Sequence, residues 1–197
     1  MSERLVFVGD SITDSHRDRS DRASLGDGFV RMIADDLDGA AEVVNVGISG
    51  NRAIDLEKRW EADVAGSSPD VLTIYIGVND TWRRFDRNDE TTAADFEASL
   101  RRLVDTDVVR SSRVIFIEPY LLPVRDEQNG WLEDLSGKRA VVTGLAREIG
   151  AGLVPLHAIL TDAAGADPAA LAPDGVHPST RGARLIGDAW LQVYRAS

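Results

Sequence analysis

Residues 5–14, close to the start of the 197-residue chain, read LVFVGDSITD. Leu5 to Val8 are all apolar, and Gly9 ends the run before the polar Asp10 and Ser11. A short apolar run without polar alternation is typical of a strand that is buried on both faces. Strands of this kind occur in parallel sheets whose two sides are covered by helices. The segment therefore predicts an α/β fold that begins with a buried strand.

The rest of the chain repeats this pattern. Further short apolar runs predict strands at residues 43–46, 71–76, 114–117 and 153–156. Amphipathic stretches predict helices at residues 28–37, 53–64, 92–104 and 135–149, and a last helix after Pro178. No linker, repeat or shift in composition divides the chain. We therefore expect a single α/β domain, residues 1–197, built on a five-stranded parallel sheet.

Composition narrows the class of partner. The chain has 22 Lys and Arg against 33 Asp and Glu, a formal net charge of −11. Nucleic acids and anionic lipids are bound through clustered basic side chains, so this balance argues against both as partners. The apolar run before Gly9 is too short for a secretory signal, and no run is long enough to cross a membrane. We therefore expect a soluble, cytoplasmic protein.

Cysteine is absent, which excludes disulfides, thiol nucleophiles and thiolate zinc sites. The only histidines are His16, His157 and His177, so a metal centre made of imidazoles alone would need all of them. We interpret His16 as a surface-loop residue, because its spacing reveals no orienting carboxylate beyond the nearby Asp14 and Asp18. We interpret His157 as a hydrogen-bonded structural residue.

Polar clusters stand where the predicted strands end. Residues 9–13, 47–51 and 77–80 follow the first three strands, and residues 174–178 precede the last helix. Ligands of open parallel sheets bind beyond the carboxyl ends of the strands, so we expect these clusters to meet there. The long polar segments 15–27 and 120–134 are candidate walls of a site, and equally good candidates for plain solvated loops.

These clusters contain the groups needed for acyl transfer. Ser11 is the candidate nucleophile, and it needs a base because a serine hydroxyl is weakly nucleophilic at neutral pH. His177 is the candidate base, and Asp174 has the spacing to hold its Nδ1. The side chain of Asn79 and the backbone N–H groups of Gly47 and Ser11 are candidate oxyanion donors. Each motif alone fits an ordinary turn or helix start, whereas their joint occurrence favours catalysis.

The four motifs resemble those of the SGNH hydrolases, also called GDSL lipases and esterases. Residues 9–11 are similar to the family's Gly-Asp-Ser block, Gly47 to the second-block glycine, residues 77–80 to Gly-x-Asn-Asp, and residues 174–177 to Asp-x-x-His. Ile12 stands where many members carry Leu. The resemblance implies a flavodoxin-like three-layer α/β/α sandwich without metal or cofactor. It also implies a triad and an oxyanion hole made of the candidates named above.

Longer stretches are similar to the subgroup that includes the serine acetylxylan esterases: residues 7–14, 45–51, 59–61 and 76–83. This resemblance implies removal of acetyl groups from xylan-derived sugars. We therefore expect a serine esterase, in a homo-oligomer, that acts through an acyl-enzyme on a small acetylated sugar or another short-chain ester. The open alternatives are a short-chain arylesterase, thioesterase or lysophospholipase, and a carbohydrate-binding protein that has lost catalysis.

Several polar and aromatic residues beside the predicted site are candidates for binding substrate. They are Asp10, Asn51, Arg52, Arg83, Arg84, Trp82, Trp131 and Tyr120. Aromatic faces suit the apolar faces of sugars, although packing is an equally good interpretation of Trp82. Arginines can bind substrate hydroxyls, although ion pairing is their more usual role. Trp60 and Trp190 lie on apolar helix faces, and we interpret both as structural.

Overall fold

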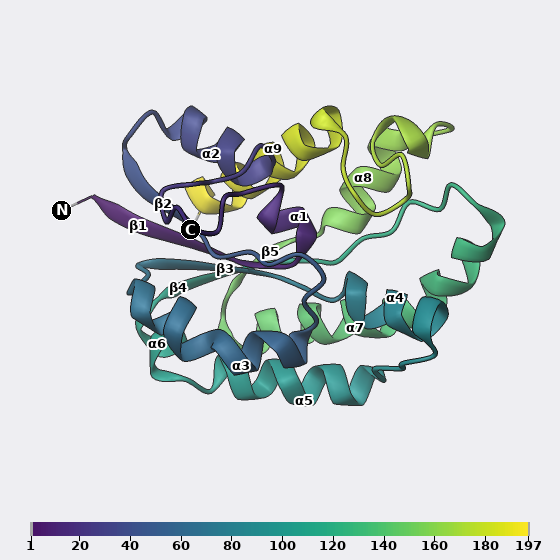
Figure 1. Cartoon of the computed structure of the whole chain (residues 1–197), viewed down its shortest axis with the longest axis horizontal. Helices are drawn as coiled ribbons and strands as arrows, with labels where there is room; N and C mark the ends of the chain where they lie inside the picture. Colours follow the sequence, from purple (N-terminus) through teal and green to yellow (C-terminus); the bar gives the residue numbers. More distant parts are fainter. Residues whose placement is uncertain (1, 197) are drawn as a thin grey trace.

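The computed structural model describes residues 2–196, and Figure 1 shows a central sheet between two layers of helices. The strands are β1 (Glu3–Gly9), β2 (Ala41–Asn45), β3 (Val71–Tyr75), β4 (Arg113–Ile117) and β5 (Gly152–Val154). All neighbouring strands are parallel, and their order is β2-β1-β3-β4-β5. The predicted five-stranded parallel sheet is confirmed, and each predicted strand overlaps an observed one.

Helices cover both faces of the sheet (Figure 1). They include α2 (Phe29–Leu37) and α9 (Thr180–Ala196) on one face, and α3 (Ala53–Asp63), α5 (Ala93–Val104) and α7 (Asn129–Ile149) on the other. Leu5 and Phe7 of β1 belong to the first apolar layer, and Val6 and Val8 to the second. All four side chains are at most 1% exposed, which is why this strand reads as a continuous apolar run. The expected three-layer α/β/α sandwich is confirmed.

Two buried tryptophans tie helices into these layers. Trp190 of α9 is fully buried and donates its Nε1–H to Oγ1 of Thr73, at 2.9 Å. Trp60 of α3 donates in the same way to Oγ1 of Thr106, at 3.2 Å. Because each indole N–H has a partner, burial of these large rings carries no unsatisfied donor. Both residues are structural, as the sequence indicates.

The predicted helices are all present, but α7 begins earlier than expected. It starts at Asn129, directly after the 3-10 helix η2 (Asp126–Gln128), so the predicted loop 120–134 is wrong beyond residue 125. Gly130 weakens the helical pattern of the first turn. Tertiary packing compensates, since the ring of Trp131 lies 5.6 Å from that of Trp82.

Some helical segments lie outside the helices that the sequence predicts. They are α1 (Ser11–Asp14), α4 (Val78–Arg87), α6 (Asp107–Ser111), α8 (Leu156–Ala164), η1 (Ala65–Ser67) and η3 (Pro168–Ala170). The most consequential is α4, whose sequence VNDTWRRFDR places five charged residues around only three large apolar ones, Val78, Trp82 and Phe85, at helical spacing. It packs on α7 and carries Asn79 in its first turn. Within residues 2–196, no helix combines the length and apolar character that a membrane crossing requires.

Candidate active site

Ser11 occupies the first position of α1, directly beyond the carboxyl end of β1. Asp10 caps this short helix, since its Oδ1 accepts the N–H of Ile12 at 3.0 Å. The Ser11 hydroxyl lies 3.0 Å from Nε2 of His177, and Nδ1 of the same ring lies 2.6 Å from Oδ2 of Asp174. The structure thus brings the three predicted residues together as hydroxyl, imidazole and carboxylate. This arrangement suits a nucleophile, its base and the group that orients the base.

The other oxygen of Asp174 organises the turn that carries the histidine. Oδ1 accepts the backbone N–H of Val176 at 2.9 Å and that of His177 at 2.7 Å. Partial burial opposes ionisation of Asp174, but hydrogen bonds from His177 and Val176 outweigh it and hold the pKa of Asp174 below its usual value. The carboxylate is therefore charged at neutral pH and can stabilise an imidazolium on His177.

A second segment, the loop after β4, braces this turn from behind. Tyr120 donates its hydroxyl to the carbonyl of Val176 at 2.6 Å, and Gln128 donates Nε2–H to the carbonyl of Asp174 at 2.7 Å. Both side chains are fully buried. Tyr120 is therefore unable to offer a face to a sugar, which corrects our prediction for this residue. The role of Gln128 has no sequence signal, because its partners lie 46 residues away and on the preceding loop.

The oxyanion donors are only partly as expected. Asn79, nearly buried on α4, donates Nδ2–H to the carbonyl of Asn51 at 3.1 Å, which leaves its second amide hydrogen for a ligand. The Gly47 N–H, in contrast, donates to Oδ1 of Asn45 at 2.9 Å. It is therefore engaged within the protein, and the prediction of Gly47 as an oxyanion donor is wrong.

The position of Gly47 needs a glycine for packing. A Cβ there would lie 2.4 Å from the backbone N of Asp14, so the loop after β2 could not approach α1. Within residues 47–51, the N–H groups of Ile48, Ser49 and Asn51 are also bonded, to Gly9 O, to Asp14 Oδ2 and to Ile48 O. Among the described residues, Gly50 N–H and Ser11 N–H have no such partner. These two amides and the Asn79 side chain are the donors that remain.

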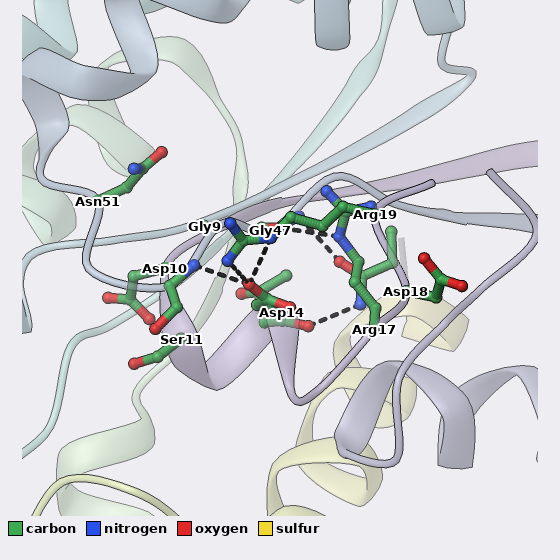
Figure 2. Close-up of polar contacts among 12 residues, drawn as sticks. Gly9, Asp10, Ser11, Asp14, Arg17, Asp18, Arg19, Gly47 and Asn51 are labelled. Atoms are coloured by element: carbon green, nitrogen blue, oxygen red, sulfur yellow. Dashed lines mark hydrogen bonds and ion pairs between the residues drawn. The ribbon is translucent and has the colours of Figure 1, made fainter. Parts of the chain in front are cut away.

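A polar clamp holds the loop after β2 against α1 (Figure 2). Asp14, nearly buried, accepts the N–H of Ser49 at 2.8 Å and forms an ion pair with Arg19. Arg17 donates Nε–H to the carbonyl of Gly47 at 2.8 Å. Figure 2 shows Asp14 in the middle of this group, with the side chain of Arg19 reaching it. The clamp fixes the backbone on either side of Gly50.

Arg59 of α3 extends the clamp to two backbone carbonyls and one side chain. It donates to the carbonyl of Val46 at 2.7 Å, to the carbonyl of Gly9 at 3.1 Å and to Oδ1 of Asn51 at 2.7 Å. It also pairs with Asp63, one turn along the helix, at 2.8 Å. The strand ends that carry the site are thereby held by one guanidinium, which can form several directed hydrogen bonds at once.

Ser11 and His177 open into a cleft of about 810 Å³. The cleft is also lined by Ser15, His16, Asp27 and Gly28, and by Thr180 at the start of α9. Residues of segment 15–27 therefore line the cleft. Of the two interpretations given for this segment, a wall of the site and a plain solvated loop, the structure favours the first. His16 Nδ1 lies 3.2 Å from Oδ1 of Asp27. The histidine thus has a carboxylate partner that sequence spacing did not reveal.

Comparison with known proteins agrees with this geometry. The model of the GDSL-like lipase/acylhydrolase family matches residues 7–185. The chain belongs to this family. As a GDSL-like acylhydrolase it is a carboxylic ester hydrolase, and the expected resemblance to the SGNH and GDSL enzymes is confirmed.

Individual relatives of this GDSL-like acylhydrolase cover almost its full length. An acetylxylan esterase from Geobacillus stearothermophilus is 34% identical over 96% of this chain and 93% of its own. The crystal structure of that esterase, Axe2, superposes with a TM-score of 0.88 over 97% of this chain and 93% of Axe2. A putative GDSL-like lipase from Parabacteroides merdae gives 0.92 at 30% identity, covering 100% of this chain and 97% of its own. Further Axe2 structures are of catalytic mutants in which a serine, an aspartate or a histidine is replaced by alanine.

The polar residues that we expected to bind substrate in the acylhydrolase are mostly engaged elsewhere. Asp10 is 1% exposed and burial raises its pKa to about 7, so it serves as a helix cap out of reach of substrate. The side-chain oxygen of Asn51 is bonded to Arg59, and Figure 2 shows this side chain directed away from Ser11. Arg52 pairs with Asp89 at 3.0 Å. The structure therefore corrects the prediction for Asp10 and Asn51 and favours ion pairing for Arg52.

The remaining candidates divide between packing and the edge of the site. Arg83 and Arg84 form ion pairs with Asp86 and Asp134, the more usual role for surface arginines. Trp131 is 6% exposed and buried against its neighbours, so its predicted exposure to sugar is wrong. The ring of Trp82 lies 5.9 Å from the imidazole of His177 and packs on Trp131.

His157 differs from expectation. Its Nδ1 is buried and, within the described residues, has no hydrogen-bond partner, so it is not the hydrogen-bonded residue that we expected. Burial, together with the positive charge of Arg139, lowers the pKa of His157 to about 4. It is therefore neutral at neutral pH. Across residues 2–196, no three His, Asp or Glu side chains gather in a group suited to a metal ion.

Proposed function

We propose that this acylhydrolase is an acetylesterase that removes acetyl groups from hydroxyl-rich alcohols, above all acetylated xylo-oligosaccharides. The observation that carries the proposal is the hydrogen-bonded chain Ser11–His177–Asp174 at the mouth of a largely polar cleft. A relative 34% identical over nearly the whole chain is an acetylxylan esterase, which supports the same substrate class. The catalytic mutants of that relative alter the same three residue types.

In the proposed acylation step, Ser11 Oγ attacks the ester carbonyl carbon while Nε2 of His177 accepts the hydroxyl proton. Asp174 stays charged and stabilises the imidazolium through Nδ1. The negative charge that forms on the carbonyl oxygen is held by the N–H groups of Ser11 and Gly50 and by the Asn79 amide. Fixed donors of this kind stabilise the transition state because they need no reorientation when the charge develops.

Collapse of the tetrahedral intermediate expels the alcohol. Nε2 of the His177 imidazolium gives its proton to the departing oxygen, and acetate stays attached to Ser11 as an ester. Water then attacks this ester while His177 accepts its proton, and acetate leaves with the serine hydroxyl restored. The protons that leave and return to Ser11 Oγ and the proton that reaches the departing alcohol all pass through Nε2, which the structure places 3.0 Å from Ser11 Oγ. The second proton of the attacking water leaves with the acetic acid and goes to solvent.

The first test is replacement of the nucleophile. We expect Ser11→Ala to fold like the parent protein, since Ser11 packs against no core cluster, and to lose nearly all activity on a short acetyl ester. Thermal melting and initial rates on phenyl acetate provide the two measurements. Parent-like rates in the folded variant would show that Ser11 is not the nucleophile.

A substrate panel tests the specificity. It compares acetylated xylo-oligosaccharides, other acetylated sugars and phenyl esters of increasing acyl length. We expect kcat/KM to be highest for acetyl groups on sugars and to fall as the acyl chain lengthens. A maximum at medium or long acyl chains would instead indicate a thioesterase or lysophospholipase. Activity confined to phenyl esters would indicate an arylesterase.

A further inference from the structure

We propose that His16 and Asp27 form the binding site for the alcohol part of the ester and recognise neighbouring hydroxyl groups of a polyol. This inference rests on the proposed function and adds the residues that set its specificity. Both residues belong to the loop between α1 and α2 and line the cleft into which Ser11 and His177 open.

The position of the cleft relative to the catalytic groups shows which half of the ester it receives. Nε2 of His177 must protonate the departing oxygen, so the alcohol has to extend from the histidine. The cleft is lined by His177 and the residues directly after it, Pro178 to Thr180. Of the three proposed oxyanion donors, only Ser11, the nucleophile itself, lines the cleft, and Gly50 and Asn79 do not. The alcohol therefore lies in the cleft, while the carbonyl oxygen points to its other side.

His16 and Asp27 each use only half of their hydrogen-bonding capacity within the protein. Oδ1 of Asp27 accepts from Ser15 Oγ at 2.9 Å and lies 3.2 Å from Nδ1 of His16. Asp27 Oδ2 and His16 Nε2 have no partner among the described residues, and the side chains are 72% and 87% exposed. One carboxylate oxygen and one imidazole nitrogen of this hydrogen-bonded pair are thus available to a ligand.

These two groups match a pair of adjacent hydroxyls. Hydrogen bonds from Ser15 and His16 lower the pKa of Asp27, so it accepts hydrogen bonds as a charged carboxylate at neutral pH. Hydrogen bonds to charged groups are stronger than those between neutral ones. The imidazole nitrogen can bond a second hydroxyl. A phenol leaving group offers no such pair, so the site discriminates between sugar and aryl esters.

The loop holds the two groups in place before substrate arrives. Ser15 and His16 are both in the left-handed region, with φ of 40° and 61°, which non-glycine residues rarely adopt. The N–H of Asp27 donates to the carbonyl of Ser15 at 2.9 Å, which ties the two ends of the loop together. A site that is already ordered loses less entropy on binding.

The test compares two acetyl esters that differ only in the alcohol. One is a methyl xyloside with a single acetyl group and two free hydroxyls, and the other is phenyl acetate. For His16→Ala and Asp27→Asn, we expect the ratio of kcat/KM for the xyloside to kcat/KM for phenyl acetate to fall about tenfold, mainly through KM. That factor corresponds to one lost hydrogen bond to a charged group. Asp21→Asn is the control, because Asp21 lies on the same loop and does not line the cleft. Its Oδ1 accepts the backbone N–H of Ala23.

The possible outcomes are distinguishable. If the parent enzyme hydrolyses phenyl acetate and not the xyloside, the sugar deacetylase function fails. If the parent cleaves the xyloside and the ratio in both variants equals that of Asp21→Asn, the His16 and Asp27 site is wrong. Equal losses on the two esters would also overturn it, since they indicate a structural role. His16→Ala leaves the Ser15–Asp27 bond intact, so it tests recognition even if Asp27→Asn disturbs the loop.

Discussion

Two glycines three positions apart have different tasks. Gly47 allows the loop after β2 to touch α1, and its N–H is bonded inside the protein. Gly50 has a φ of 83° and open space where a side chain would start, since the nearest atom to a Cβ, on Arg83, would be 3.9 Å away. The first glycine is thus required for packing, whereas the second is required for backbone conformation and is our proposed amide donor to the oxyanion.

This contrast gives a prediction at the scale of the residue. We expect Gly47→Ala to lower the free energy of unfolding by about 1–3 kcal/mol, because its Cβ would meet the backbone of Asp14. Gly50→Ala costs about 1–2 kcal/mol of backbone strain, and we expect it to reduce kcat by about tenfold or more as the amide shifts. Denaturant titration and initial rates measure both effects. Parent-like kcat in Gly50→Ala, with kcat lost in an equally folded Gly47→Ala, would reverse the assignment.

At the scale of the element, the turn that carries the histidine depends on the loop after β4. This turn, residues 174–177, has no helix or strand of its own, and its backbone is held by Tyr120, Leu122 and Gln128. Gln128 also accepts the N–H groups of Val124 and Arg125 through Oε1. The buried side-chain amide of Gln128 therefore sets the shape of the loop and, through it, the position of Asp174 beside His177.

We expect Gln128→Leu to uncouple these two segments. The variant leaves the Asp174 carbonyl and two loop N–H groups unsatisfied, so stability should fall by about 1–3 kcal/mol. Because Asp174 can then shift, kcat should fall more than KM rises. Tyr120→Phe is the matched control, since it removes only one hydroxyl from the same brace. A stability loss in Gln128→Leu without any change in kcat would show that the brace is not needed to position the triad.

At the scale of the whole molecule, topology brings distant residues together and buries ionisable groups. Ser11 and His177 are 166 residues apart, yet they meet because β1 lies between β2 and β3 inside the sheet and Trp190 of α9 packs on Phe7 of β1. The fold also encloses Asp80 of α4, whose pKa burial raises to about 7, and the half-buried His157 of α8, whose pKa falls to about 4. These groups link folding to pH in opposite directions.

His157 makes the fold less stable in acid. Its pKa of about 4 in the folded state is below the ordinary 6.5, so the unfolded chain binds more protons between these values, and stability falls as pH falls through them. Asp80 has a folded pKa of about 7, above the ordinary 3.8, so its contribution is present at low pH and is lost as pH rises toward 7.

Two variants separate these effects. We expect His157→Leu to flatten the loss of stability between pH 6.5 and about 4. We expect the stability of Asp80→Asn relative to the parent to increase from pH 5 to pH 8, because its amide oxygen can still accept the Ala53 N–H without a buried charge. Melting temperatures across this pH range are the measurement. The same pH profile in parent and variants would show that neither group is linked to folding.

The sequence predicts the parts of this protein whose signal is local. The apolar runs predict all five strands, and Thr92 predicts the start of α5, where its Oγ1 accepts the N–H of Asp95 at 3.1 Å. Ser11, Asp174 and His177 are recognisable because each stands in a short motif with its own turn chemistry. In α4, by contrast, only three large apolar residues stand at helical spacing among five charged ones, and packing on α7 stabilises the helix.

The sequence by itself determined the parallel sheet and the choice of Ser11, Asp174 and His177 as candidates, because strand burial and turn motifs depend on neighbouring residues. Only the tertiary structure decided that the Gly47 amide is bonded inside the protein, that Tyr120 and Trp131 are buried, and that Asp27 stands beside His16 on the lining of the cleft. A polar group's availability depends on whether another group has already bonded it. The Gly47 N–H is bonded by Asn45, two residues earlier, and the Asn51 side chain is bonded by Arg59 of α3. Only the folded chain shows that these bonds form.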